Sequence, residues 1–153
     1  MKTEALIWSL QTMCFFYCED IPAVCSEIQR VLTPDGKLIC STYRKKTHAG
    51  SQQAGPGFDD RIVLSADRLY ERFGRENGAD ILAPYFSRIF WESYRDSLLV
   101  PDAEPLISYI LSCHGNQNQY LLDKYKDFRG FVSRKTKDGF FITKDAGIFL
   151  CEK

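Results

Sequence analysis

Residues 20–43 read DIPAVCSEIQRVLTPDGKLICSTY and carry the signals for a helix, a turn and a strand in direct succession. Asp20 is a residue type that caps helix N-termini, and Pro22 suits the first helical turn. Apolar residues at helical spacing continue up to residues 33–36 (TPDG), which predict the end of the helix and a turn. Residues 37–43 then predict a strand.

A short apolar run precedes this stretch. Residues 5–10 (ALIWSL) suit a strand that is covered on both faces, and residues 13–18 (MCFFYC) indicate the loop that leaves it. A strand, a helix, a tight turn and a second strand within about 40 residues form a βαβ unit, whose two strands run parallel. The first part of the chain therefore predicts an α/β fold.

The rest of the chain alternates between helical and strand patterns. The glycine-rich residues 44–60 are typical of a loop. Two short runs at the end, 140–143 and 148–151, suit strands joined by a hairpin or a bent connection at residues 144–147. Between the loop and the hairpin the sequence predicts one strand and three helices. The strand is expected at 86–92 and the helices at about 66–77, 102–113 and 117–128, the first of them capped by Ser65 and ended by Asn77-Gly78.

The composition is that of a globular domain without a charge bias. Among 153 residues, 44% are hydrophobic and 26% charged, and 20 basic side chains balance 20 acidic ones. Nucleic-acid and membrane-surface binders need a basic excess, so the zero net charge argues against both. No apolar run is long enough for a transmembrane helix and the first residues lack the form of a signal peptide, so we expect a cytoplasmic protein.

Neither the cysteines nor the histidines form a recognisable site. The six cysteines include no Cys-x-x-Cys pair, so we expect reduced, buried thiols and no metal site. His48 and His114 are far apart in the sequence, and no His–Asp pair lies near Ser41-Thr42 to complete a triad. Residues 55–57 (GPG) lack the spacing of a nucleotide-binding loop.

Residues 13–20 and 26–38 together resemble the class I S-adenosylmethionine-dependent methyltransferases of the type 11 kind. In that family the helix after the fourth strand ends in Glu-x-x-Arg-Val-Leu-Lys-Pro-Gly-Gly and leads to the fifth strand; this chain has EIQRVLTPDG. Stretches within 85–109 and 142–149 are similar to the family as well. The resemblance covers most of the chain, least clearly residues 44–80.

The match is to the second half of the family's domain. By resemblance the complete sheet runs 3-2-1-4-5-7-6, and this chain is expected to supply strands 4-5-7-6 with flanking helices. The expected fold is thus a truncated Rossmann-like α/β sheet, in one partial methyltransferase domain over residues 1–153. The family's glycine-rich turn and ribose-binding acid belong to the first half. From the second half, the family uses the end of strand 4 in the S-adenosylmethionine site. In this chain the resemblance places that strand end at Leu10, Gln11, Thr12 and Met13.

The same resemblance implies a substrate wall of Phe16, Tyr17 and Tyr43, with residues 44–84 as a loop and lid segment. Family members often carry a histidine where this chain has Tyr17, and a tyrosine is a poor base at neutral pH. No catalytic residue is therefore assigned. The expected reaction is transfer of a methyl group from S-adenosylmethionine to a small molecule.

The strand at residues 5–10 carries an expectation about partners. In the complete sheet it pairs with strand 1, so here its apolar edge is expected to lie open, without the charge or proline that protects natural edges. We expect a homodimer or a separate chain with the missing strands to cover it. Three functions stay open: an enzyme half completed by a partner, a catalytically inactive remnant that acts as a dimerising or binding module, and an unrelated α/β binding domain.

Overall fold

The computed structural model describes residues 6–44, 54–64 and 69–153 of the chain. These residues divide between two compact units, each of which is described by itself. Unit 1 comprises residues 1–45, 69–95 and 145–153, and unit 2 comprises residues 46–68 and 96–144.

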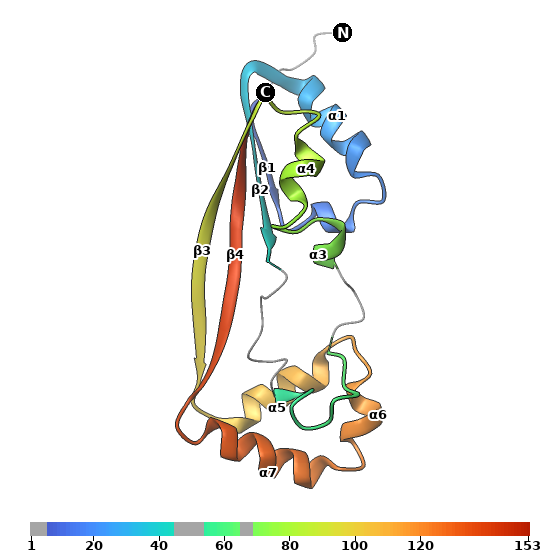
Figure 1. The fold of residues 1–153 in the computed structure, drawn as a ribbon, viewed down its shortest axis with the longest axis vertical. Coiled ribbons are helices and arrows are strands. Elements are labelled where there is room, and N and C mark those ends of the chain that lie inside the picture. Colours follow the sequence, from blue (N-terminus) through green and yellow to red (C-terminus); the bar gives the residue numbers. More distant parts are fainter. Residues whose placement is uncertain (1–5, 45–53, 65–68) are drawn as a thin grey trace. The chain divides into compact units, whose positions relative to one another are not determined.

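A four-stranded sheet with the order β1-β2-β4-β3 is the main element (Figure 1). β1 pairs with β2 in parallel, and β2 pairs with β4 antiparallel. β3 and β4 also run antiparallel, because the Ser87 amide donates to the Glu152 carbonyl (2.9 Å) whereas Trp91, four residues later, lies beside Gly147. The strands are β1 (Leu6–Thr12), β2 (Leu32–Tyr43), β3 (Arg88–Val100) and β4 (Phe140–Glu152).

Short helices cover one face of the sheet in unit 1 (Figure 1). They are η1 (Phe15–Tyr17), α1 (Ile21–Val31), α3 (Leu69–Arg72) and α4 (Gly78–Leu82). The carboxylate of Asp20 accepts a hydrogen bond from the Ala23 amide at 2.9 Å and so satisfies one of the free donors at the start of α1. The core beneath these helices contains Cys25, Ile28, Leu38, Cys40, Phe73, Leu82, Phe149 and Cys151.

Unit 2 has a separate apolar core, built mainly from three helices. They are α5 (Ala103–Ser112), α6 (Gln117–Leu121) and α7 (Tyr125–Thr136). The Asp102 carboxylate caps α5 by accepting from the Glu104 amide at 3.2 Å. The buried residues of this core include Ile62, Leu106, Ile107, Ile110, Leu121, Phe128 and Val132.

Several predictions from the sequence are confirmed. The strand expected at 5–10 is β1, the helix capped by Asp20 is α1, and the helix expected at 102–113 is α5. The expectation that β1 is covered on both faces is wrong, because Trp8 and Leu10 are exposed. The parallel pairing of β1 with β2 confirms the βαβ unit. The strand expected at 86–92 is present as β3 but extends to Val100.

The predicted C-terminal hairpin is wrong, because residues 140–152 form one continuous strand. Ala146 and Gly147 pair with Tyr43 and Thr42 of β2, and the Arg44 amide donates to the Asp145 carbonyl at 2.9 Å. The residues that looked like a turn are thus held in a ladder by β2. Pairing across the sheet overrides the local preference of these residues for a turn.

The helix expected at 66–77 is also wrong in its extent. α3 ends at Arg72, and Asn77 lies just before a second helix, α4, which begins at Gly78. The Asn77 side chain bridges the break, accepting from the Gly74 amide (2.7 Å) and donating to the Glu71 carbonyl (2.8 Å). Ser65, the expected cap, lies outside the described residues.

Three smaller differences concern segment ends. The helix expected at 117–128 is interrupted after Leu121 and continues as α7. β2 begins at Leu32 instead of residue 37, with an irregular pairing opposite residues 6–8 of β1. The expected loop at 13–18 contains the 3-10 helix η1. Residues 45–53 of the expected loop and lid lie outside the described residues, and the lid and the single partial domain stay predictions.

Candidate functional site

The carboxyl ends of β1 and β2 lie side by side at one end of the sheet in unit 1. In α/β sheets, ligands bind outside the carboxyl ends of parallel strands. Here β1 leads into Met13, whose backbone φ of 50° lies in the left-handed region that residues other than glycine rarely adopt. The Ser41 hydroxyl of β2 fixes this strained residue by accepting a hydrogen bond from the Met13 amide at 3.0 Å. Strained residues of this kind cluster at functional sites. The carboxyl ends of β1 and β2 are therefore the first candidate for a binding site.

The four residues predicted to bind the cofactor are consecutive and lie at the carboxyl end of β1. Leu10 and Thr12 are exposed, whereas Gln11 and Met13 are partly buried. The Gln11 side chain donates to the Ser9 hydroxyl (3.3 Å) and accepts from the Cys14 thiol (3.2 Å). The segment therefore has a fixed geometry, and its assignment to a cofactor stays a prediction.

The three aromatic residues predicted to contact a substrate do lie together. Phe16 contacts the rings of Tyr17 and Tyr43, with ring centroids 4.8 Å and 6.5 Å away. Phe16 is buried in the core of unit 1, whereas Tyr17 is 67% exposed and Tyr43 is half-buried. Only the two tyrosines therefore offer a surface to a ligand, with Phe16 supporting them from behind.

Arg75 contacts Tyr43 through its backbone and was not predicted from the sequence. Its backbone amide donates to the carbonyl of Tyr43, the last residue of β2, at 3.0 Å. Its guanidinium carbon lies 5.0 Å from the centroid of the Trp91 ring. The sequence predicted a continuous helix over about 66–77, which includes Arg75. Gly74 was the only signal that this helix breaks.

The edge of β1 is open in the structure. β1 is the terminal strand of the sheet, and Ile7, Trp8 and Leu10 are 64%, 54% and 66% exposed. Leu10 pairs with Ile39 on the face of the sheet opposite the helices, whereas Ser9 pairs with the buried Leu38 on the covered face. An edge strand with large exposed apolar side chains is a typical site of association with another chain.

The cysteines of unit 1 are free thiols, three of them buried. Burial and the neighbouring Cys151 and Cys18 thiols raise the pKa of Cys25 to about 11. A hydrogen bond with the Cys151 thiol, together with burial, raises the pKa of Cys40 above its ordinary value. Cys25 and Cys40 are therefore protonated at neutral pH and act as small apolar residues. Among the described residues no cluster of His, Cys, Asp or Glu suits a metal ion.

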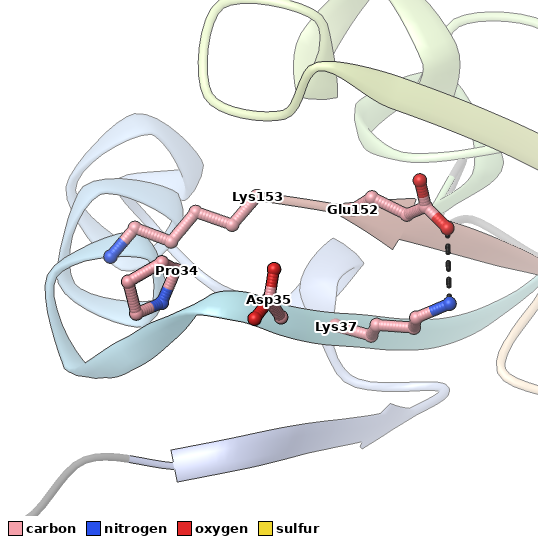
Figure 2. A pocket seen from close by; sticks show the side chains of 5 residues that line it. All are labelled: Pro34, Asp35, Lys37, Glu152 and Lys153. Atoms are coloured by element: carbon pink, nitrogen blue, oxygen red, sulfur yellow. Dashed lines mark hydrogen bonds and ion pairs between the residues drawn. The ribbon is translucent and has the colours of Figure 1, made fainter.

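A hollow of about 270 Å³ lies at the opposite end of β2 from Tyr43 (Figure 2). It is lined by Pro34, Asp35, Lys37, Glu152 and Lys153. The Lys37 ammonium donates to the Glu152 carboxylate at 3.0 Å, and the Lys153 ammonium donates to the Leu32 carbonyl at 2.7 Å. Each lysine thus has a hydrogen-bond acceptor within the protein. We therefore interpret the hollow as a charged end of the sheet and not as a reaction centre.

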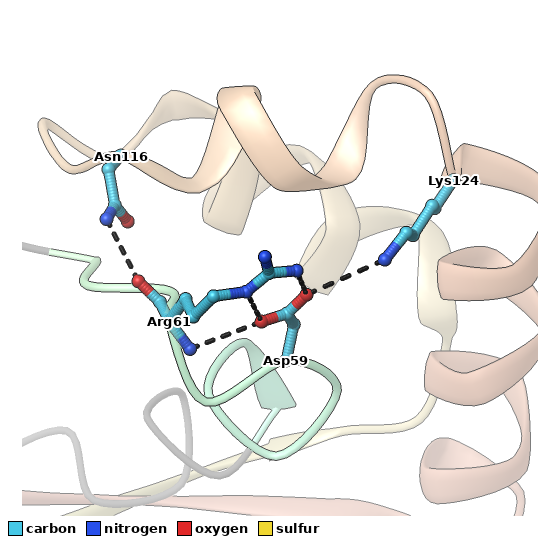
Figure 3. Close-up of polar contacts among 4 residues, drawn as sticks. All are labelled: Asp59, Arg61, Asn116 and Lys124. Atoms are coloured by element: carbon cyan, nitrogen blue, oxygen red, sulfur yellow. Dashed lines mark hydrogen bonds and ion pairs between the residues drawn. The ribbon is translucent and has the colours of Figure 1, made fainter.

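Unit 2 contains a polar network centred on the carboxylate of Asp59 (Figure 3). Arg61 donates to both Asp59 oxygens (2.8 and 2.6 Å), and the Lys124 ammonium lies 3.7 Å away. Hydrogen bonds from Arg61 hold the pKa of Asp59 well below its usual range. Asn116 accepts from the Val63 amide (2.7 Å) and donates to the Arg61 carbonyl (2.9 Å), so the network joins residues 59–63 to the α6 region.

His114 is exposed in unit 2, and His48 lies outside the described residues. Within the described ranges, no helix has both the length and the apolar character needed to cross a bilayer.

Comparisons with known proteins find a likeness of fold alone. No family model matches the sequence, and no curated protein matches it either. Among solved structures, the chain is similar to the crystal structure of a putative methyltransferase from Bacillus halodurans C-125, with a TM-score of 0.55 and 13% sequence identity. The likeness covers 98% of this chain but 65% of the other, so the chain spans less than two thirds of that protein. The mixed α/β fold, with a sheet and flanking helices, is therefore similar to the fold of that protein.

Proposed function

We propose that the chain is the second half of an S-adenosylmethionine-dependent methyltransferase domain, which transfers a methyl group to a small molecule when another polypeptide covers β1. The observation that carries the proposal is the sheet itself. In the order β1-β2-β4-β3, β1 and β2 are parallel, β4 is antiparallel to both of its neighbours, and β1 is open at the edge. This order is the one expected for strands 4-5-7-6 of the family's sheet. The likeness to the Bacillus halodurans protein supports the same reading.

The end of β1 would supply part of the cofactor site. Leu10 and Thr12 are exposed there, and the Ser41 hydroxyl holds the strained backbone at Met13. This fits one wall of a cofactor site, because the described residues offer an accessible strand end with a fixed backbone. S-adenosylmethionine would supply an electrophilic methyl group on its sulfonium. The role of the chain's own residues would be to position the cofactor and to exclude water.

Tyr17 and Tyr43 would bind the methyl acceptor. Their rings lie next to Phe16 at the same edge of the sheet as Met13, so an acceptor that rests on them would lie close to the end of β1. The aromatic faces favour an acceptor with an apolar or planar part. Each hydroxyl can donate or accept a hydrogen bond and can thereby orient the acceptor.

The partner that we propose is a separate polypeptide that adds a strand parallel to β1. The strand has one free edge, and its other edge pairs in parallel with β2. A further parallel strand would extend this parallel pair, and the helices of such a polypeptide would cover the exposed Trp8 and Leu10. A second copy of this chain is the competing occupant, and the mass of the species crosslinked at position 7 distinguishes the two.

A catalytically inactive dimerising or binding module is the second candidate. It is favoured by the same open edge of β1, since a pair of such edges in two copies is enough to explain the exposed side chains. In that case the aromatic cluster at Phe16 is only part of the apolar core. The two candidates differ in whether covering β1 creates a cofactor site.

The test is calorimetric titration with S-adenosylmethionine before and after β1 is covered. A photo-crosslinking residue in place of Ile7, which is exposed, would capture the polypeptide at the edge. The purified complex is then titrated. We expect no heat from the isolated chain and one-site binding by the complex. Substitution Thr12→Trp should abolish that binding, and Thr143→Trp, at an exposed position in unit 2, should leave it intact. A complex with covered β1 and no cofactor binding would overturn the methyltransferase proposal in favour of the binding module.

A further inference from the structure

Arg75 differs from the other arginines that the structure describes in how its hydrogen-bond donors are used. Arg30, Arg61 and Arg129 each place a nitrogen 2.6 Å from a carboxylate oxygen. Arg72 donates to the Cys18 carbonyl at 2.7 Å. By contrast, the Nε of Arg75 is buried and has no hydrogen-bond partner among the described residues.

The guanidinium of Arg75 is held against aromatic rings. Its central carbon lies 5.0 Å from the centroid of Trp91 and 6.0 Å from that of Phe149. Contacts of this kind are attractive, but an aromatic face does not replace the in-plane acceptors that a guanidinium requires. A buried donor without an acceptor is destabilising, and more so when the group is charged. The stacking therefore orients the group without satisfying it.

The backbone around Arg75 is fixed independently of the side chain. The Arg75 amide donates to the Tyr43 carbonyl, and the Gly74 amide donates to the Asn77 side chain. The Thr42 hydroxyl donates to the Phe73 carbonyl at 2.7 Å and anchors the segment to β2 from the other side. The backbone of Arg75 is thus fixed at the carboxyl end of β2, and its guanidinium is preorganised over the rings of Trp91 and Phe149 before any ligand arrives. Preorganisation reduces the entropy that binding must overcome.

We propose that Arg75 is the anchor of a binding site for an anionic oxygen group, a carboxylate or a phosphate, on the small molecule that reaches Tyr43. A planar guanidinium matches both groups through two parallel N–H donors. The Arg75 side chain as a whole is partly exposed, so an anion can reach the guanidinium from solvent. The identification of this molecule as the methyl acceptor rests on the function proposed above, whereas the anion site does not.

The test follows the Nε–H resonance of Arg75 by heteronuclear NMR on the whole chain. Inorganic phosphate and acetate are the probes, and sodium chloride at equal ionic strength is the reference. We expect a saturable shift of this resonance and of the Trp91 indole N–H with one of the probes, and the stronger of the two identifies the class of anion. Chloride should produce neither shift.

Variants separate charge from geometry. Arg75→Met keeps an apolar side chain beside Trp91, removes all donors and should weaken binding, followed at the Trp91 resonance, by about tenfold or more. Arg75→Lys keeps the charge but loses the paired donors, so it should bind with intermediate affinity. Arg88→Met is the matched control, because Arg88 is 71% exposed and pairs with Glu152 at 3.6 Å. It should bind like the wild type.

The site is overturned if neither probe gives a saturable shift up to roughly 50 mM, which would place an affinity beyond the range of specific binding. It is also overturned if chloride is as effective as both probes, or if Arg75→Met binds the stronger probe like the wild type while its circular dichroism matches. A titration with S-adenosylmethionine on the same samples keeps the two proposals apart. Anion binding without cofactor binding leaves the Arg75 site standing, and cofactor binding without anion binding removes it.

Discussion

The Asp59 carboxylate accepts hydrogen bonds from Arg61 and forms an ion pair with Lys124 in another segment of unit 2. Its contribution to stability therefore depends on pH. Because Arg61 and Lys124 hold the pKa of Asp59 below the ordinary value of about 4, the folded state binds fewer protons there than the unfolded state. The stabilisation is present above pH 4 and is lost as the pH falls through the lowered pKa. We expect Asp59→Asn to unfold at a lower denaturant concentration than the wild type at neutral pH, and this difference to shrink below pH 4.

Glu27 is the matched control for this prediction. It also pairs with an arginine, Arg30, at 2.6 Å, but both side chains are more than half exposed on the surface of α1. Exposed pairs of this kind are worth little, so Glu27→Gln should hardly change the denaturation midpoint at any pH. Equal effects of Asp59→Asn and Glu27→Gln would show that the network around Asp59 adds nothing to an ordinary surface pair.

The sequence reveals residues whose role is local and misses those whose role depends on tertiary contacts. Asp20 could be assigned as a cap because an N-cap needs only its own helix. Asp59 and Arg75 could not, since their partners, Lys124 and Trp91, are distant in the sequence. Phe16, Tyr17 and Tyr43 could be grouped because the βαβ unit already brings two strand ends to one edge.

At the scale of the element, Gly147 explains how β4 remains one strand. A Cβ atom at this position would overlap the Trp91 ring and the carbonyl oxygen of Glu92 in the neighbouring strand. Glycine is thus required here for close packing against β3. We expect Gly147→Ala to lower the free energy of unfolding by about 1–3 kcal/mol, as other overpacked positions do. Urea denaturation followed by circular dichroism measures the change.

Gly130 offers the opposite result on the same scale. It lies within α7, and the nearest atom to a Cβ at this position is a nitrogen of Arg134 at 3.6 Å. Alanine has the higher helix propensity and meets no obstacle, so Gly130→Ala should raise stability by roughly 0.5–1 kcal/mol. If both glycine substitutions change stability in the same direction, packing against Trp91 is not the reason for glycine at position 147.

Elements were predicted well where local signals and packing agree, and poorly where a neighbouring strand decides. α1 and α5 have a capping aspartate and apolar spacing, and both are present close to the expected positions. Residues 144–147 carry the composition of a turn, yet they pair with the end of β2. No local pattern reports this pairing, because it depends on residues about 100 positions earlier in the chain.

At the scale of the whole molecule, the open edge of β1 is the feature that the sequence anticipated best. An apolar run without charge or proline was expected at an uncovered edge, and the structure places it there with its largest side chains exposed. The sequence could anticipate this because the resemblance fixed which strand should be terminal. The cover itself belongs to the proposal made above, because it depends on contacts that one chain does not contain.

Association through β1 gives a prediction for the chain in isolation. In the isolated chain the open edge should pair with other copies, because unpaired backbone groups lie beside exposed apolar side chains. We expect sedimentation velocity to show concentration-dependent association. The double substitution Trp8→Lys and Leu10→Lys should suppress it, since charge on an edge opposes pairing, and should change stability little because both side chains are exposed. Leu122→Lys, at another exposed apolar position in unit 2, should associate like the wild type. A wild-type chain that stays monomeric at high concentration would show that β1 does not need a cover.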